Sequence, residues 1–191
     1  MKSFLFLIVA IFYSTALFSQ EISSPEIQIK QAQMVLLAAN AKDATVFGYN
    51  KEGILVTLKK GTNELVCLAD DPFKSGFSVA AYHQALDPYM ARGRALKKEG
   101  KKFNEIFKIR GEEINAGLYN IPDKSTLYVM TGEFDENQNP TKTYLRYVIY
   151  VPFATAKSTG LPTSPVTPGG PWIMDPDTYR AHIMVNPKNS N

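Results

Sequence analysis

The stretch TYLRYVIYVPF, residues 143–153, has the strongest strand pattern in the chain. It is filled with β-branched and aromatic residues, which favour extended structure. Leu145, Tyr147 and Ile149 alternate with Tyr144 and Val148, so both faces of the strand are largely apolar. Such a strand needs cover on both sides, and we therefore place it centrally in a sheet with helices on at least one face. Central pairing should end near residue 152, because proline has no N–H for the ladder.

Other segments show the same two-residue alternation between turn signals and are also predicted to be strands. The first three follow one another closely, with turns containing Gly53 and Gly61 between them, and are interpreted as an antiparallel meander. The six additional predicted strands are residues 45–49, 54–58, 65–69, 77–83, 126–131 and 181–185.

Three segments carry helix signals. Ser24 is a capping residue followed by proline, and that helix is expected to run to about residue 40. Asp87 followed by proline begins a second helix, which should end at Gly100. A third helix is predicted over residues 102–116, weakened in the middle by Gly111 and so open to division into two pieces.

The predicted order of elements indicates one α+β domain over residues 21–191. Its core would be a single mainly antiparallel sheet of about six or seven strands with two or three packed helices. Residues 154–180 contain many prolines and glycines, and regular structure is expected to stop there. A loop this long in a compact domain is usually functional or disordered.

The first twenty residues combine Lys2 with an apolar run from Phe4 to Phe18, which is typical of a signal peptide. A retained membrane anchor is the alternative, although the run is short for a bilayer span. The net charge is +3, and it falls to +2 if Lys2 is removed with the signal. So small a charge argues against a nucleic-acid or other general polyanion partner.

Cys67 is the only cysteine, so no intramolecular disulfide can form and the fold must be stabilised by packing. It alternates in phase with apolar neighbours, which favours a buried small side chain over a nucleophile. The chain contains no phosphate-binding glycine loop, GxGxxG, GxSxG or HExxH motif. The common enzyme and cofactor classes therefore have no support from motifs, and cofactors stay unassigned.

The candidate catalytic residues are the only two histidines, His83 and His182, with Asp70 and Asp71. Histidine can act as a base or a metal ligand near neutral pH, and an aspartate could orient it. This requires the fold to bring the strands that carry the two histidines together. Two separate structural histidines are the alternative interpretation.

The candidate ligand-binding residues are Arg92, Arg94, Trp172 and Tyr179. The arginines begin a basic stretch that continues through several lysines, which could bind an anion or simply be a solvated helix face. Arg92 is placed to bind a carboxylate. Trp172, with Tyr179 in the proline-rich loop, could be a stacking platform for a ligand or could anchor the loop to the domain.

Several segments resemble those of an uncharacterised family of exported bacterial proteins. They are CLADDP at residues 67–72, DPYMARGRAL at 87–96, YVIYVPFATAKSTGLP at 147–162, PWIMDP at 171–176 and AHIMV at 181–185. The resemblance covers most of the chain after residue 20. It implies export from a bacterial cytoplasm and brings no activity, cofactor or site residue.

Three hypotheses follow. The first is an exported, soluble binding or interaction module for a small molecule, glycan or peptide, whose surface combines the loop at 154–180 with Arg92 and the histidines. The second is a hydrolase that uses the histidines and aspartates, with or without a metal. The third is a passive component of the cell envelope. Each places the protein in a periplasm or outside the cell.

Overall fold

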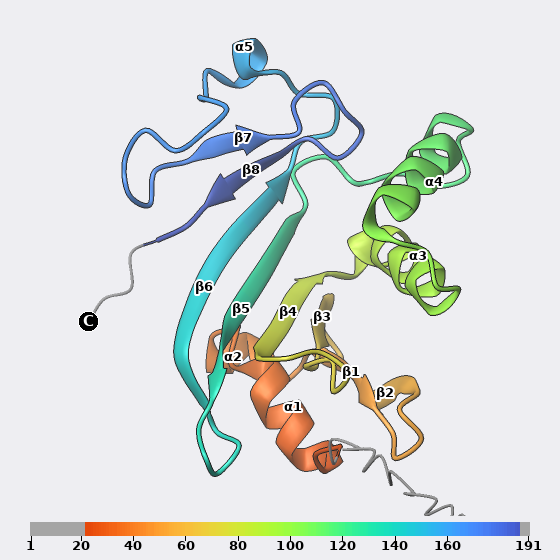
Figure 1. Cartoon of the computed structure of the whole chain (residues 1–191), viewed down its shortest axis with the longest axis vertical. Helices are drawn as coiled ribbons and strands as arrows, with labels where there is room; N and C mark the ends of the chain where they lie inside the picture. The colour runs from red at the N-terminus through yellow and green to blue at the C-terminus, as the bar shows by residue number, and fades with distance from the viewer. Residues whose placement is uncertain (1–21, 188–191) are drawn as a thin grey trace, which may run out of the picture.

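The computed structural model describes residues 22–187, so the predicted signal peptide lies outside the described residues. The described chain forms one eight-stranded sheet with the order β2-β1-β3-β4-β5-β6-β8-β7, in which only the β1–β3 pair is parallel (Figure 1). The strands are β1 Thr45–Tyr49, β2 Leu55–Lys59, β3 Leu65–Leu68, β4 Phe77–His83, β5 Thr126–Phe134, β6 Pro140–Tyr150, β7 Trp172–Met174 and β8 His182–Val185. This confirms the α+β class and adds one strand to the expected number.

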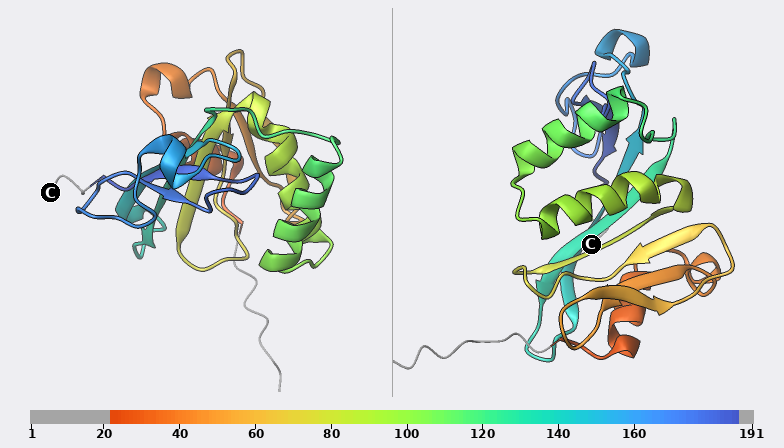
Figure 2. Two further views of the ribbon diagram at one scale, coloured as in Figure 1. Left: turned by 90° about the horizontal axis from the view of Figure 1, so that it is seen from above. Right: turned by 90° about the vertical axis from the view of Figure 1, so that its right-hand side faces the viewer.

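Helices lie on both faces of this sheet. The two longest, α3 and α4, run beside each other and extend away from the strands (Figure 2). The helices are α1 Pro25–Gln33, α2 Ala38–Ala41, α3 Asp87–Lys98, α4 Phe103–Asn115 and α5 Ala156–Thr159, and a 3-10 turn, Gln84–Leu86, leads into α3. None of the helices within residues 22–187 is both long and apolar enough to cross a bilayer.

The long β5–β6 hairpin is the central feature of the sheet. Its two strands pair from Thr126 opposite Ile149 down to Phe134 opposite Pro140. The turn at its tip is closed by the carboxylate of Asp135, whose Oδ1 accepts the N–H groups of residues 137 and 139 at 2.9 and 2.8 Å. The prediction of a central strand is therefore confirmed for the upper half of β6, which also pairs with β8.

The predicted antiparallel meander of the first three strands is wrong. β1 and β2 form an antiparallel hairpin, but the chain then returns so that β3 pairs with β1 in parallel. Burial gives the physical reason. Val66 and Cys67 of β3 are 6% and 0% exposed and need an internal position, whereas no residue of β2 is buried and that strand can form the sheet edge.

The first helix is shorter than predicted. α1 begins as expected, with Ser24 Oγ accepting the N–H of Ile27, but it ends at Gln33. The chain then turns, and the side-chain amide of Gln33 donates to the carbonyl of Ala41 at the end of α2. This turn buries Val35 against the sheet. The apolar pattern of this segment alone predicts that the helix continues.

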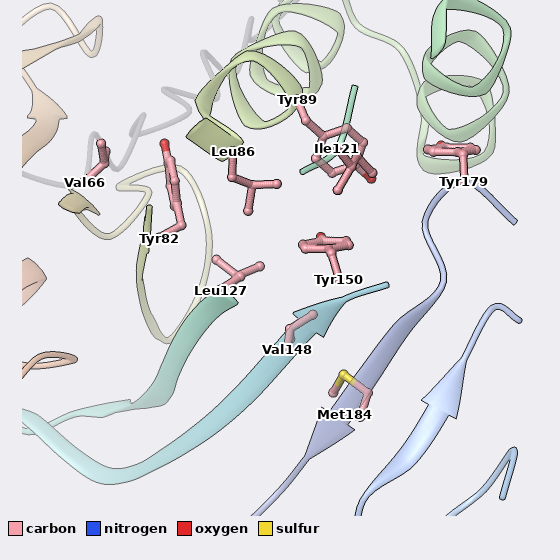
Figure 3. Close-up of a cluster of buried hydrophobic side chains, with 10 residues drawn as sticks. All are labelled: Val66, Tyr82, Leu86, Tyr89, Ile121, Leu127, Val148, Tyr150, Tyr179 and Met184. Carbon is pink, nitrogen blue, oxygen red and sulfur yellow. The ribbon is translucent and has the colours of Figure 1, made fainter. Parts of the chain in front are cut away.

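Alternation along the strands produces two apolar cores, one on each face of the sheet. Even-numbered residues of β4 and β6, such as Tyr82, Val148 and Tyr150, face the side that α3 begins to cover, and the cluster they join is drawn in Figure 3. Odd-numbered residues of β4, such as Val79, face the side covered by α1. The period of two residues thus places each strand side chain on one face of the sheet or the other.

Tyr179 attaches α4 to the sheet. Its hydroxyl donates to the carbonyl of Phe107 at 2.7 Å, and its ring lies 6.4 Å from that of Tyr89 on α3. Gly111 does not divide α4, because its lack of a Cβ admits this ring: a Cβ there would come within 2.8 Å of Tyr179 Cε1. The glycine that weakens the helix locally is therefore needed for packing.

The expectation that residues 154–180 lack regular structure is wrong in two places. They contain α5 and the added strand β7, which pairs with β8 through Ile173. The N–H of Ile173 also donates to Pro162 O at 2.9 Å, so the middle of the segment is tied to the sheet edge. The remaining irregular part, residues 160–171, projects beside β7 (Figure 1).

Candidate functional site

The two histidines lie on opposite faces of the sheet. His83 ends β4 on the side of α1, and its Nε2 lies 3.1 Å from Glu64 Oε2. His182 lies on β8 on the other face, 9% exposed, where its Nδ1 is 2.7 Å from Arg180 O and its ring is 5.6 Å from that of Tyr150. Burial lowers the pKa of His182. Three strand spacings, about 14 Å, separate the two strands.

The two aspartates lie at the opposite end of β4 from His83. Asp70 Oδ1 accepts the N–H of Ser78 at 2.7 Å, and five residues of strand, about 17 Å, separate Ser78 from His83. Asp71 accepts a bond from Lys97 Nζ at 2.5 Å. The fold therefore does not assemble the histidine–aspartate site. Within residues 22–187, no group of three or more His, Cys, Asp or Glu side chains is placed to hold a metal ion.

Asp70 and Asp71 differ in ionisation. Burial raises the pKa of Asp70 to about 6, against the opposing effect of the Ser78 N–H, and the charge of Asp71 raises it further. Burial also acts to raise the pKa of Asp71, but the hydrogen bonds from Lys97 and the N–H of Phe73 outweigh it and leave that pKa below its ordinary value. Asp70 is thus a partly buried carboxylate with no ion-pair partner among the described residues.

Arg92 and Arg94 are both engaged inside the protein. Arg92 binds Glu113 on α4 through Nε and Nη2, at 2.9 and 2.6 Å, which joins the two long helices. Arg94 donates to Tyr82 Oη and Asp87 Oδ1, each at 2.9 Å. Both guanidinium groups therefore hold α3 in place, and neither faces a hollow suitable for a ligand.

Trp172 and Tyr179 serve mainly as anchors. Trp172 lies in β7 and packs against the cluster of Figure 3, and Tyr179 is a member of that cluster. Of the two interpretations of the loop aromatics, the positions favour the one in which they attach the loop to the domain. Trp172 nevertheless leaves a buried indole Nε1–H without an acceptor among the described residues.

A hollow lies beside the irregular part of the loop. It has a volume of about 550 Å³ and is lined by loop residues 165–170, by Tyr144 of β6, and by Asn186 and Pro187 after β8. Ligand sites commonly have volumes of a few hundred to about 1,000 Å³. The loop at 154–180 was predicted to contribute a binding surface, and it does line this hollow, but through its prolines and glycines.

Next to the hollow, at Tyr144, one edge of β6 is left unpaired by the described residues. β6 pairs with β8 only from Tyr147 to Tyr150, and Figure 1 shows β6 continuing below the end of β8 toward the hairpin tip. The N–H and C=O of Tyr150 bond toward the β5 side, so by alternation those of Leu145 point toward the β8 side. In the continued register the partner of Leu145 would be Pro187, which has no N–H.

The ladder between β6 and β8 ends before Leu145 because Pro187, its partner in the continued register, has no N–H to donate. No described residue bonds to the outward N–H and C=O of Leu145, and on the side away from β5 no described strand pairs with residues 141–146. A bulge at Lys142, whose φ is +48°, marks the lower limit of the regular edge. The candidate site is thus an open strand edge, hereafter the β6 edge (residues 141–146), which adjoins the hollow at Tyr144.

Comparison with known proteins gave no guide to this site. No family model, no curated protein and no solved structure matches the chain.

Sequence reasoning located part of this site and missed the rest. The prolines of the loop marked it as unusual, but Tyr144 and Asn186 carry no motif. The one available signal was Pro187 at the end of the last predicted strand, because a proline there predicts that pairing stops. Which neighbouring strand this leaves exposed depends on the strand order, which local patterns do not determine.

Asp70→Asn is expected to change how stability depends on pH. The folded-state pKa of about 6 lies above the ordinary value of 3.8, so this group's contribution to stability falls as pH rises from about 4 to above 6. Asn keeps an acceptor for Ser78 N–H and cannot ionise. The variant should be about 1–2 kcal/mol more stable than wild type at pH 7.5 and equal to it below pH 4.

Urea unfolding at several pH values measures this difference, with the exposed Asp123→Asn as the matched control, expected to be neutral throughout. An Asp70→Asn variant that is less stable at pH 7.5 would show that the charged carboxylate stabilises the fold, contrary to this account.

Proposed function

We propose that the protein is an exported interaction module that binds an extended peptide segment along the β6 edge. The supporting observation is the outward N–H and C=O of Leu145, which lack partners among the described residues and directly follow Tyr144, a residue that lines a hollow of about 550 Å³. An added strand would bond to this edge in the way that β8 bonds to the upper half of β6.

The shape of the hollow supports a peptide. One side of it is formed by Tyr144, next to the donor and acceptor of Leu145, and another by the loop at 165–170, which supplies apolar surface from prolines and Val166. Backbone hydrogen bonds would give affinity that is independent of sequence, while side chains of the peptide would contact the loop and Tyr144. An exposed fraction of 76% for Val166 leaves its side chain available for such contact.

An open edge is also a risk, because it can pair with a copy of itself. Natural proteins protect such edges with charged residues and bulges, and Lys142 with the adjoining bulge serves this purpose at the lower end of the edge. The upper part next to the hollow has no bulge, and its one charged side chain, Arg146, has no ion-pair partner among the described residues. The lower end of the edge is thus better protected against strand pairing than the upper end, which favours ligand binding beside the hollow.

Export is proposed from the sequence of residues 1–20. N-terminal sequencing of the protein recovered from its native cell tests it. A first residue near Glu21 supports export, whereas retention of Met1 contradicts cleavage.

Selection from a displayed library of random dodecapeptides tests peptide binding directly. The immobilised protein should enrich binders, and Val166→Glu should weaken their affinity at least tenfold because it places a charge on the apolar wall of the hollow. N-methylation of alternate peptide N–H groups should have a similar effect, since it removes donors to the strand edge.

Leu118→Glu is the matched control, since Leu118 is also aliphatic, 71% exposed, and absent from the hollow. Both substitutions are on the surface and should change the free energy of unfolding by no more than about 0.5 kcal/mol. Failure to enrich any peptide over a blank surface, or equal weakening by the two variants, would contradict the proposal.

A further inference from the structure

Arg146 differs from every other arginine in the chain. The chain has five arginines, and four of them are held internally: Arg92 by Glu113, Arg94 by Asp87, Arg110 over the ring of Tyr89, and Arg180 by Asp175. The side chain of Arg146 is partly buried, yet its guanidinium makes no hydrogen bond, ion pair or ring contact with any residue in the described range 22–187. Its nitrogen atoms keep contact with solvent, so the guanidinium is accessible to a ligand.

The position of Arg146 places it at the upper end of the open edge. It immediately follows Leu145 on β6, one residue before the ladder with β8 begins at Tyr147. Its side chain emerges on the same face of the sheet as that of Tyr144, two residues earlier, which lines the hollow. A peptide paired with the β6 edge would therefore pass directly beside the guanidinium.

Two buried polar atoms without partners lie on the same face. In the continued register Asn186 stands across from Arg146, and its Oδ1 accepts no hydrogen bond from any described residue. Trp172 is paired with Met184, two residues before Asn186, and its Nε1–H has no acceptor within residues 22–187. Unsatisfied buried groups are uncommon and costly, so these two atoms, on the same face as the unpaired guanidinium of Arg146, indicate a surface completed by a ligand.

We infer that the peptide bound at the β6 edge carries a carboxylate that pairs with Arg146. This inference rests on the proposed function and names the chemistry of its ligand. A guanidinium fits a carboxylate through two parallel N–H···O bonds, which is the strongest contact that this side chain can make. An amide N–H of the peptide would satisfy Asn186 Oδ1.

A carboxylate suits the surroundings better than a phosphate. A phosphate carries up to two negative charges and usually recruits more than one cation. The nearest other cation on β6 is Lys142, which is already held by Glu133 at 2.6 Å. Asn186 Oδ1 is moreover an acceptor and would repel additional phosphate oxygens.

Paired peptides test the inference. A selected dodecapeptide is compared with versions in which each Asp or Glu is changed to Asn or Gln, and with a version amidated at its C-terminus. Affinities are measured by calorimetry for wild type, Arg146→Gln and the control Lys157→Gln, which removes the same charge from an exposed side chain without an ion-pair partner among residues 22–187.

The acidic peptide should bind Arg146→Gln about tenfold or more weakly than wild type, as expected for loss of a charge-assisted hydrogen bond. It should bind Lys157→Gln as tightly as wild type. The neutral version should bind wild type and Arg146→Gln alike. Loss on side-chain neutralisation identifies Asp or Glu as the source of the carboxylate, and loss only on amidation identifies the peptide C-terminus.

Equal weakening of acidic and neutral peptides by Arg146→Gln would overturn the inference, because it would show a loss of packing rather than of charge pairing. Binders that contain no required carboxylate would overturn it while leaving peptide binding at the β6 edge intact. If no peptide is enriched at all, the proposed function fails and the inference fails with it.

Discussion

The arrangement of the candidate site depends on the missing N–H of Pro187. β6 has eleven residues and pairs with β5 along nearly its whole length, but its other side pairs with β8 over only four residues. Pro187 stands where the next ladder bond would form and cannot donate it. The chain therefore leaves the sheet at that point. As a result, β6 is an internal strand where it pairs with β8, from Tyr147 to Tyr150, and has an open edge before Tyr147.

The rest of the fold makes that open edge rigid. Apolar side chains on the two faces of β6 join different cores, Val148 and Tyr150 on one side and Leu145 on the other. The Arg92–Glu113 ion pair holds α3 and α4 together, and the bond from Arg94 to Tyr82 of β4 attaches α3 to the sheet. A binding strand would therefore meet a preformed edge and would not need to order it, which reduces the cost of association.

Local patterns predicted the elements better than their arrangement. Strand and helix types followed from alternation and from caps such as Ser24, since these signals are encoded within a few residues. The parallel pairing of β3 with β1 and the strand β7 depend on contacts between distant segments, and the apolar pattern of either segment does not specify its neighbour.

The contrast between local pattern and three-dimensional arrangement also explains why the predicted site residues are not those of the candidate site. Arginine and histidine were selected for their chemistry, yet Arg92 and Arg94 pair with carboxylates within the fold and His182 is buried in it. Arg146 attracts no attention in the sequence because it lies inside the strongest strand pattern. Only the absence of a partner in three dimensions distinguishes it, and no single-sequence pattern contains that information.

Amide hydrogen exchange at Leu145, followed by NMR in the free protein, tests the central claim most directly. The outward N–H of Leu145 has no acceptor among the described residues, whereas that of Tyr147 faces β8 within the paired ladder. We expect the amide of Leu145 to exchange at least about a hundredfold faster than that of Tyr147, because unpaired edge amides open without breaking a ladder bond. Equal protection of the two amides would show that the β6 edge is already paired and would contradict the account.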